Sequence, residues 1–234
     1  KLGQNVASLI NDGDTVEIGI GKIQSTVLEP LKTRKNLSIH GGMICDPIID
    51  LYNSGAISKL SETHQPITTG VAVGTRKLYD FVADCPDIYF KPVTFTHNIN
   101  VLEKIDNLIA INSAIEVDLL GQANAEMING TQVSGGGGLV DFLRGGRRSK
   151  NGKAIIALVS TTSDGKRSRI VCDFLPNTIS TVPRADIDFV ITENGIADLR
   201  NKSTTERTNE LIYKAAAPQF IDQLEECRKK IPGI

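Results

Sequence analysis

Hydrophobic positions in the first half of the chain follow two alternating periods, one typical of helices and the other typical of strands. Apolar residues three and four apart predict amphipathic helices, and short apolar runs bounded by turn residues predict buried strands. Regular alternation of the two indicates an α/β fold, a sheet with helices on both faces. The predicted helices are residues 2–11, 24–32, 47–54, the segment carrying Leu78, Phe81 and Val82, and 98–105; the predicted strands are 15–20, 37–40, 67–73, 88–93 and 107–112.

The second half adds antiparallel features, so the open sheet is predicted to be mixed. Asn129-Gly130, between apolar segments at 123–128 and 131–134, is a strong hairpin signal. The remaining predictions are a central strand at 153–160, a turn at 163–166 with 169–174 returning antiparallel, a last buried strand at 187–192, and helices at 203–216 and 218–230. Because no linker interrupts this pattern, residues 1–234 are expected to form one domain.

Composition and charge exclude several classes of protein. The net charge is -1 and the pI is about 6.4, so no overall field attracts nucleic acid or an anionic membrane. No apolar run approaches the roughly 20 residues that span a bilayer. Residues 1–20 have the pattern of a helix, a turn and a strand rather than a signal peptide. The chain begins at Lys1 instead of methionine, which suggests a fragment or a processed chain.

The cysteines and histidines do not have the spacing of a metal site. No C-x-x-C pair and no Cys/His cluster occurs, so neither structural zinc nor a catalytic metal is expected. Reduced thiols in a cytoplasmic protein are the expectation. The residues concerned are Cys45, Cys85, Cys172, Cys227, His40, His64 and His97.

Other common catalytic motifs are missing as well. No G-x-S-x-G elbow is present, which argues against an α/β-hydrolase serine. Gly152-Lys153 and Gly165-Lys166 lack the upstream glycine and the following Ser or Thr of a phosphate-binding P-loop. The glycines at 19 and 21 are followed by Gln24 where a dinucleotide fingerprint has a third glycine, so NAD is not expected.

A carboxylate and a run of glycines remain as candidate chemistry. Glu116 stands where a strand is expected to end, and Gly135 to Gly138 precede a predicted helix. Glycine amides at a helix start can approach an oxyanion or a phosphate closely. Two alternatives stay open: the glycines could form a flexible loop or a close packing contact, and Glu116 could lie on a solvent-exposed face.

At these residues the sequence resembles the acetyl-CoA hydrolase/transferase family, which includes 4-hydroxybutyrate and butyrate–acetate CoA-transferases. Residues 112–119 (NSAIEVDL) with Gly121-Gln122 resemble its active-site glutamate segment, and 135–142 (GGGGLVDF) fit its glycine loop. Residues 192–200 (TENGIADLR) resemble a third block. The resemblance covers nearly the whole chain. It implies a CoA-transferase (NagB/RpiA-like) fold and the C-terminal catalytic half of a subunit about twice as long, whose N-terminal domain is absent here.

The resemblance also implies a mechanism. Glu116 would attack an acyl-CoA thioester and form a covalent glutamyl-CoA thioester, with coenzyme A as a substrate. The amides of Gly136, Gly137 and Gly138 would stabilise the oxyanions, and Gly19 and Gly21 are further candidates for oxyanion or CoA binding. Glu193 is a rival nucleophile; its alternative role is a buried ion pair with Arg200.

A basic cluster follows the glycine loop. Arg144, Arg147 and Lys150 could contact the phosphates of CoA, while a solvated helix face would explain them equally well. Two segments depart from the family pattern. At 40–43 the chain reads HGGM, where family members usually carry a small hydroxyl residue and a glutamate before the methionine; at 22–24 it reads KIQ, where alanine and proline are usual. Both segments are expected near the cleft, so the acyl preference cannot be carried over.

Three classes of function are compatible with these residues. The first is transfer of CoA from an acyl-CoA to a small carboxylic acid (acetate, butyrate or 4-hydroxybutyrate class), with acyl-CoA hydrolysis as its nearest alternative. The second is a non-catalytic CoA-binding half that works with a separate N-terminal half. The third is an isomerase of sugar phosphates with the same fold. A homo-oligomer is expected, without nucleic acid or membrane partners.

Overall fold

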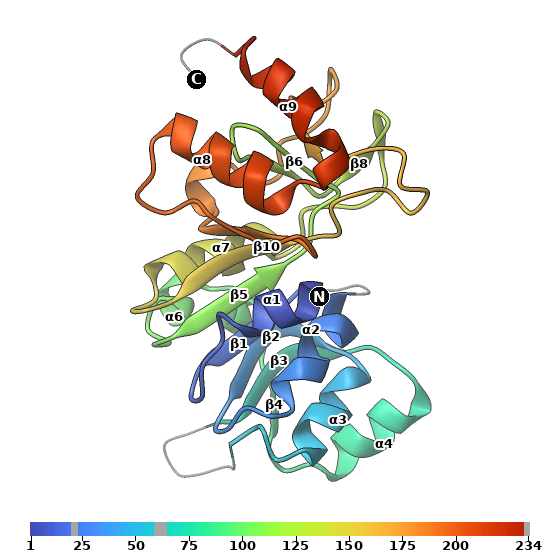
Figure 1. The fold of residues 1–234 in the computed structure, drawn as a ribbon. Helices are drawn as coiled ribbons and strands as arrows, with labels where there is room; N and C mark the ends of the chain where they lie inside the picture. Colours follow the sequence, from blue (N-terminus) through green and yellow to red (C-terminus); the bar gives the residue numbers. More distant parts are fainter. Residues whose placement is uncertain (20–22, 59–64, 232–234) are drawn as a thin grey trace.

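The computed structural model describes residues 1–19, 23–58 and 65–231. Its main feature is an eight-stranded sheet in the order β13-β12-β10-β5-β1-β2-β3-β4, in which every pair is parallel except β12 with β13 (Figure 1). Its strands are β1 (Thr15–Ile18), β2 (Ser38–Ile44), β3 (Ile67–Ala72), β4 (Ile88–Phe90), β5 (Leu108–Asn112), β10 (Lys153–Ala157), β12 (Phe189–Ile191) and β13 (Ile196–Asp198).

Helices cover both faces of this sheet. They are α1 (Leu2–Ala7), α2 (Ile23–Leu31), α3 (Pro47–Asn53), α4 (Arg76–Asp84), α5 (Val93–Thr96), α6 (Ile99–Leu102), α7 (Leu139–Arg148), α8 (Thr204–Glu210) with a π-helical continuation at Leu211–Ala215, and α9 (Ile221–Arg228). Short 3₁₀ turns lie at Arg184–Asp186 and Pro218–Phe220.

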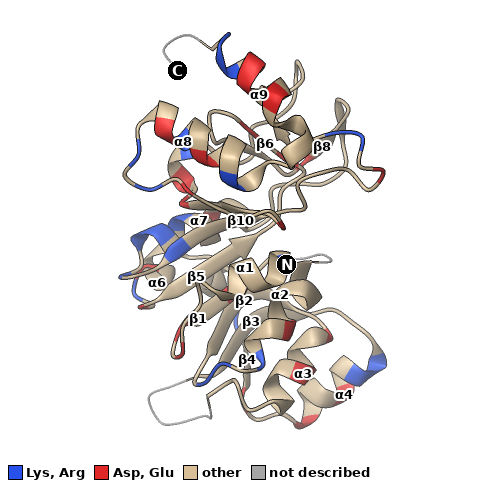
Figure 2. Ribbon diagram, viewed as in Figure 1, with Lys and Arg blue, Asp and Glu red and all other residues tan. Residues whose placement is uncertain are grey.

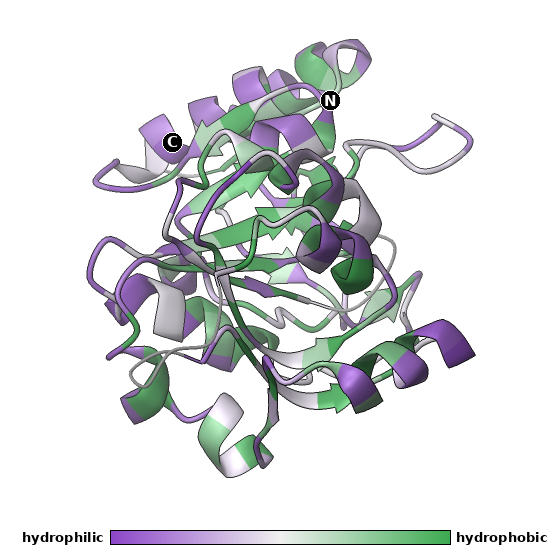
Figure 3. Ribbon diagram, turned by 90° about the horizontal axis from the view of Figure 1, so that it is seen from below, coloured by the Kyte–Doolittle hydropathy of each residue, from purple (hydrophilic) through white to green (hydrophobic). Residues whose placement is uncertain are grey.

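Strand β5 shows why the sheet needs two helical layers. All five of its residues are buried, and successive side chains of a strand point to opposite faces. Ile109 and Ile111 join the core beneath α1, α2 and α3, whereas Leu108 and Ala110 join the core beneath α6 and α7. Figure 3 shows the same layering, with hydrophobic strands inside and hydrophilic residues on the helices outside. The predicted α/β fold with an open mixed sheet and helices on both faces is confirmed.

Shorter strands build a second layer above the carboxyl ends of the central strands (Figure 1). One small sheet has the order β11-β6-β7, and a separate hairpin pairs β8 with β9. Their bounds are β6 (Glu116–Asp118), β7 (Ala123–Asn124), β8 (Met127–Ile128), β9 (Thr131–Gln132) and β11 (Ile170–Val171). The hairpin predicted at Asn129-Gly130 is confirmed: both residues have positive φ, 49° and 77°, as a type I′ turn requires.

Three predicted details of the strands are wrong. Strand β2 does not end at His40 but runs on through Gly41 and Gly42 to Ile44, because Gly41, Met43 and Ile44 continue the ladder with β3. The predicted antiparallel return of 169–174 is limited to a bridge between Thr161 and Ser168, and β11 pairs in parallel with β6 instead. The strand at 187–192 is not the last, since β13 turns back beside it.

The expectation of four reduced thiols is also wrong. Cys172, which follows β11, forms a disulfide with Cys227 in α9, while Cys45 and Cys85 are free. The sequence separation of 55 residues hid this pair from any spacing argument. The disulfide attaches the C-terminal helix to the small sheet. Within the described residues, no helix is long and apolar enough to cross a membrane.

Candidate functional site

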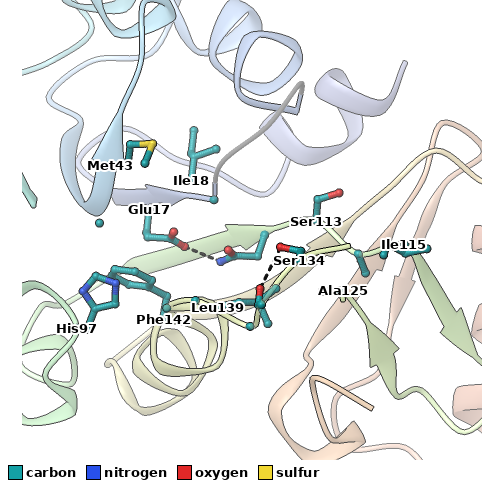
Figure 4. Close-up of a pocket in the computed structure, with 18 residues that line it drawn as sticks. Glu17, Ile18, Met43, His97, Ser113, Ile115, Ala125, Ser134, Leu139 and Phe142 are labelled. Carbon is teal, nitrogen blue, oxygen red and sulfur yellow. Dashed lines mark hydrogen bonds between the residues drawn. The ribbon is translucent and has the colours of Figure 1, made fainter. Parts of the chain in front are cut away.

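The strand order places a crevice between β1 and β5. The chain passes from β1 to β2, β3 and β4 on one side, and then returns to β5 on the other side of β1. In open parallel sheets, ligands bind at the carboxyl ends of the strands where the order reverses in this way. A cavity of about 430 Å³ lies there (Figure 4). Its lining comprises Glu17, Ile18, Gly19, Gly42, Met43, His97, Asn112, Ser113, Ala114, Ile115, Ala125, Ser134, Gly135, Gly136, Gly137, Gly138, Leu139 and Phe142.

The four glycines border this cavity and lead into α7. Gly138 is the N-cap residue of α7, and Gly137 has a φ of 52°, a conformation that favours glycine. Among the described residues, none accepts a hydrogen bond from the amide groups of Gly135 to Gly138. Free amides at the start of a ten-residue helix suit a negatively charged oxygen. Gly136, Gly137 and Gly138 line the cavity, and their role in oxyanion or CoA binding stays a prediction.

The hairpin fixes where the glycine run lies. The amides of Val133 and Ser134, which follow β9, both donate to the carbonyl oxygen of Glu126, which precedes β8. Glu126 is also held through its carboxylate by the hydroxyl group of Thr181. The chain therefore enters the glycine run from a fixed point beside β7, and not from a loose loop.

His97 is a cavity residue that sequence reasoning did not identify. Its ring lies in a slot between two glycines: a Cβ atom at Gly42 would fall 2.9 Å from the ring, and one at Gly138 would fall 2.2 Å from it. The ring packs on Phe142 at 4.6 Å between centroids, and its Nδ1 lies 2.8 Å from the hydroxyl oxygen of Thr96. The lack of a side chain at Gly138 therefore also permits a close packing contact, which is one of the alternatives that the sequence left open for the glycine run. Burial lowers the pKa of His97, against the opposing effect of the Asp141 charge.

Glu17 is the second cavity residue that was missed. It lies in β1, only 2% of it is exposed, and its Oε2 accepts a hydrogen bond of 2.8 Å from Nδ2 of Asn112. Burial raises the pKa of Glu17 to about 8, because this effect outweighs the opposing hydrogen bonds from Asn112 and the backbone at Ile111. A signal was present in the sequence: a glutamate inside an apolar parallel strand needs a partner or a proton.

The proton on Glu17 leads to a prediction about stability. The folded chain holds this proton up to about pH 8, whereas an unfolded glutamate releases it near its ordinary value of 4.5. The free energy of unfolding therefore falls as pH rises through the window from 4.5 to 8. We expect Glu17→Gln to match the wild type at pH 5 and to exceed it by roughly 4 kcal/mol at pH 8.5.

Urea unfolding at the two pH values measures this difference. The exposed Glu29 on α2, substituted as Glu29→Gln, is the matched control and should show the same small effect at both. A stability difference between Glu17→Gln and the wild type that is equal at pH 5 and pH 8.5 would rule out a buried proton on Glu17.

Glu116 lies next to the cavity but is not part of its lining. It is half-buried in β6, opposite Asn124 of β7, and its Oε1 accepts a hydrogen bond of 3.0 Å from Nδ2 of Asn124. The neighbours Ile115 and Ala125 do line the cavity. Because side chains alternate along a strand, Glu116 and Asn124 are directed to the other face of this strand pair. The nucleophilic role of Glu116 stays a prediction.

The glycines near β1 differ in their availability. Gly19 lines the cavity, but its amide donates to the carbonyl oxygen of Ile111 at 2.8 Å and is not free to bind an oxyanion. A Cβ atom at Gly19 would fall 2.3 Å from Oδ1 of Asn112, so this glycine makes room for the amide that contacts Glu17. Gly21 lies outside the described residues.

The predicted ion pair between Glu193 and Arg200 is wrong. The Glu193 carboxylate accepts hydrogen bonds from the backbone amide and the hydroxyl group of Ser160. These hydrogen bonds connect the segments that follow β10 and β12. Arg200 instead pairs with Asp198 at 2.8 Å and stacks over Phe189. Glu193 does not line the cavity.

The basic cluster is paired with carboxylates. Arg144 contacts Asp186 at 2.8 Å, Arg147 contacts Asp188 at 3.0 Å, and Lys150 lies 3.9 Å from Asp106. Blue residues gather on α7 in Figure 2, and Arg147 and Lys150 lie at or beyond the end of this helix opposite Gly138. None of the three basic residues lines the cavity. Contacts with CoA phosphates stay a prediction that would require exchange of these ion pairs.

The described residues contain no group of three or more His, Cys, Asp or Glu side chains that could hold a metal ion.

Comparison with known proteins identifies the family. Residues 74–227 match the model of the acetyl-CoA hydrolase/transferase C-terminal domain. The 4-hydroxybutyrate coenzyme A transferase of Clostridium kluyveri is 43% identical over 98% of this chain and 54% of its own length. The solved 4-hydroxybutyrate CoA-transferase of Porphyromonas gingivalis is 39% identical, with a TM-score of 0.84 over 98% of this chain and 55% of its own.

A second solved relative has a similar relation to the chain. RipA from Yersinia pestis is 32% identical, with a TM-score of 0.90 over 98% of this chain and 52% of its own. Relatives named acetyl-CoA hydrolases are more distant, at 28–30% identity. The chain spans about half the length of the curated relatives it matches. It belongs to the acetyl-CoA hydrolase/transferase family.

Proposed function

We propose that the protein to which this chain belongs transfers CoA from an acyl-CoA to a small carboxylic acid, and that the cavity between β1 and β5 binds the reacting thioester. The observation that carries the proposal is the row of glycine amides on the cavity wall that have no hydrogen-bond acceptor among the described residues, in a chain of this family. The volume of about 430 Å³ suits a short acyl group with the end of the pantetheine arm.

The proposed reaction has four balanced steps, with Glu116 as the nucleophile. Its carboxylate attacks the thioester carbonyl carbon and releases CoA thiolate, which gives an acyl-glutamyl anhydride. The thiolate then attacks the glutamyl carbonyl carbon, which gives a glutamyl-CoA thioester and the free carboxylate of the donor. An incoming carboxylate attacks this thioester and forms a second anhydride and thiolate. The thiolate finally attacks the new acyl carbon, and Glu116 is regenerated.

Each step passes through a tetrahedral oxyanion, which the amides of Gly136, Gly137 and Gly138 would stabilise by donating hydrogen bonds. Loss of one such donor typically costs about 3–4 kcal/mol in the reaction barrier. The geometry adds a requirement for Glu116: its side chain must leave Asn124 and turn past Ile115 to reach the cavity. The distance that the Glu116 carboxylate must move to reach the thioester therefore depends on the position of β6.

Trapping the intermediate tests the nucleophile. The full-length protein is incubated with acetyl-CoA, reduced with borohydride and mapped by peptide mass spectrometry. Modification of Glu116 supports the proposal, whereas modification of Glu17, Glu193 or any other carboxylate contradicts it. Turnover with and without added acetate separates transfer from hydrolysis: release of free CoA that is independent of acetate would contradict transfer.

A second candidate is a CoA-binding half without covalent chemistry of its own. The observation that favours it is Gly42, which lines the cavity at the position where family members usually carry a glutamate. The only carboxyl group in the described lining is that of Glu17, and it is protonated below about pH 8. A protonated carboxyl group is a poor nucleophile.

Restoring a carboxylate at position 42 distinguishes the two candidates. If the cavity lacks its nucleophile, the wild-type full-length protein will exchange no CoA, and Gly42→Glu will introduce exchange. Gly42→Gln is the matched control, since it has the same size and the same contact with the His97 ring but carries no carboxylate. Exchange by the wild type, or equal rates in the two variants, would exclude the non-catalytic candidate.

A further inference from the structure

Glu17 lies in the cavity but takes no part in the proposed transfer reaction. Glu17 follows Val16, whose side chain joins the core beneath α1, α2 and α3, so Glu17 points to the opposite face, where α7 lies. Figure 4 shows the Glu17 carboxyl group at the end of a dashed line, which is its hydrogen bond with Asn112, and the rings of His97 and Phe142 lie below it on the α7 side. The carboxyl group is therefore a buried part of the cavity lining.

Two features hold this carboxyl group in one orientation. Nδ2 of Asn112, at the end of β5, donates to Oε2 of Glu17 at 2.8 Å. Gly19 allows this, since any larger residue there would meet the same Asn112 side chain. Gly41 of β2 lies beside the aliphatic part of Glu17, with its would-be Cβ 3.8 Å from Cγ. Three neighbouring strands thus shape one pocket around a single acid.

A negative charge on the Glu17 carboxyl group would not be balanced by a cation in the described lining of the cavity. The cavity lining contains neither lysine nor arginine among the described residues. The titratable groups on the elements packed around it are His40 in β2, His97 after α5, and Asp141, Arg144, Arg147 and Arg148 in α7, and the three arginines pair with Asp186, Asp188 and Glu103. Burial lowers the pKa of both histidines, and His40 is further occupied by a contact with the carbonyl oxygen of Thr96. A buried acid without a cation stays neutral, and a neutral acid is a hydrogen-bond donor.

We propose that Glu17 is a substrate-binding acid, whose neutral carboxyl group donates a hydrogen bond to the carboxylate of the small acid that accepts CoA. The proposal rests on the proposed function for the identity of its ligand. A hydrogen bond from a carboxylic acid to a carboxylate is short and charge-assisted, and it needs no cation in an apolar cavity. Ile18, Ala114 and Phe142 offer apolar surface for the chain of such an acid.

Butyrate binding to the full-length protein to which this chain belongs tests this proposal. Amide signals of the ¹⁵N-labelled protein are followed during titration with butyrate at pH 6.5 and at pH 9.5. Butyrate is ionised at both values, so only the protein changes its protonation. With loss of the proton near pH 8, we expect the affinity for butyrate to be roughly 30-fold lower at pH 9.5.

Glu17→Gln provides the decisive comparison, because its amide group remains a donor and does not titrate. This variant should bind butyrate with the same affinity at both pH values, while Glu29→Gln should keep the wild-type difference. Wild-type binding that is independent of pH, an equal loss at pH 9.5 in Glu17→Gln, or no butyrate binding at pH 6.5 would each overturn the proposal. The carbon signal of the Glu17 carboxyl group reports its protonation directly in the wild type, even if the variant fails to fold.

Failure of this proposal and failure of the proposed function have different signatures. CoA exchange by the full-length protein, together with butyrate binding that does not depend on pH, would contradict the proposed role of Glu17 and would still support CoA transfer. Butyrate binding that depends on pH, in a protein that exchanges no CoA, would contradict the proposed transfer reaction and leave Glu17 as part of an acid-binding pocket.

Discussion

Glutamine in place of Glu116 is expected to abolish CoA exchange in the full-length protein while the fold stays nearly as stable as that of the wild type. An amide cannot form the acyl-glutamyl anhydride, and removal of a covalent nucleophile typically costs roughly 10⁴-fold or more in turnover. The side-chain oxygen of glutamine can still accept the hydrogen bond from Asn124, so the melting temperature should change little. Exchange of labelled acetate into acetyl-CoA measures the activity.

The rival glutamate supplies the control for this experiment. Glu193→Gln should reduce exchange far less, since the Glu193 carboxylate is occupied by Ser160 and does not line the cavity. Retained exchange in Glu116→Gln would exclude Glu116 as the nucleophile. A large drop in its melting temperature would instead show that the Glu116–Asn124 contact is structural.

Alanine in place of Gly138 is expected to disable the cavity through a steric effect. The φ of Gly138 is -88°, which alanine adopts freely, so backbone strain is not the cause. The added Cβ atom would lie 2.2 Å from the His97 ring and 3.0 Å from the Phe142 ring, and the glycine amides must shift to relieve this contact. We expect a loss of at least ~100-fold in exchange, comparable with loss of one oxyanion donor, and a lower melting temperature.

A neighbouring glycine and a double variant separate the possible causes of that loss. Gly135→Ala adds a Cβ atom with nothing within 4 Å and should behave nearly as the wild type. His97→Ala combined with Gly138→Ala removes the clash and should recover most of the lost stability. Equal behaviour of Gly138→Ala and Gly135→Ala would contradict the packing of His97 against the glycine run.

Much of the fold could be predicted from the hydrophobic pattern, since long buried strands such as β5 and amphipathic helices such as α7 have strong periodicity. The wrong details have physical causes. Gly41 and Gly42 have the composition of a turn, yet tertiary pairing with β3 keeps them in a strand. The partner of β11 is β6, which lies about 50 residues earlier in sequence, and no local signal encodes that pairing.

The candidate site was only partly predictable for a similar reason. Gly136, Gly137 and Gly138 form a contiguous run, so the sequence alone singled them out as candidate site residues. Glu17 and His97 are isolated residues in segments without a motif, and only the strand order brings them together. The apolar segment around Glu17 signals a buried carboxyl group, but its partner Asn112 lies 95 residues later, and only the pairing of β1 with β5 brings the two together.

We expect the CoA thioester to bind in the cavity between β1 and β5, which Gly135 to Gly138 line. Amide chemical shifts of the ¹⁵N-labelled full-length protein, recorded while acetyl-CoA is added, report where the thioester binds. Saturable shifts are expected at the amides of Gly136, Gly137 and Gly138, with smaller changes at Asn112 and Ser113. Unchanged glycine amides at a concentration of acetyl-CoA that shifts signals elsewhere in the chain would contradict it.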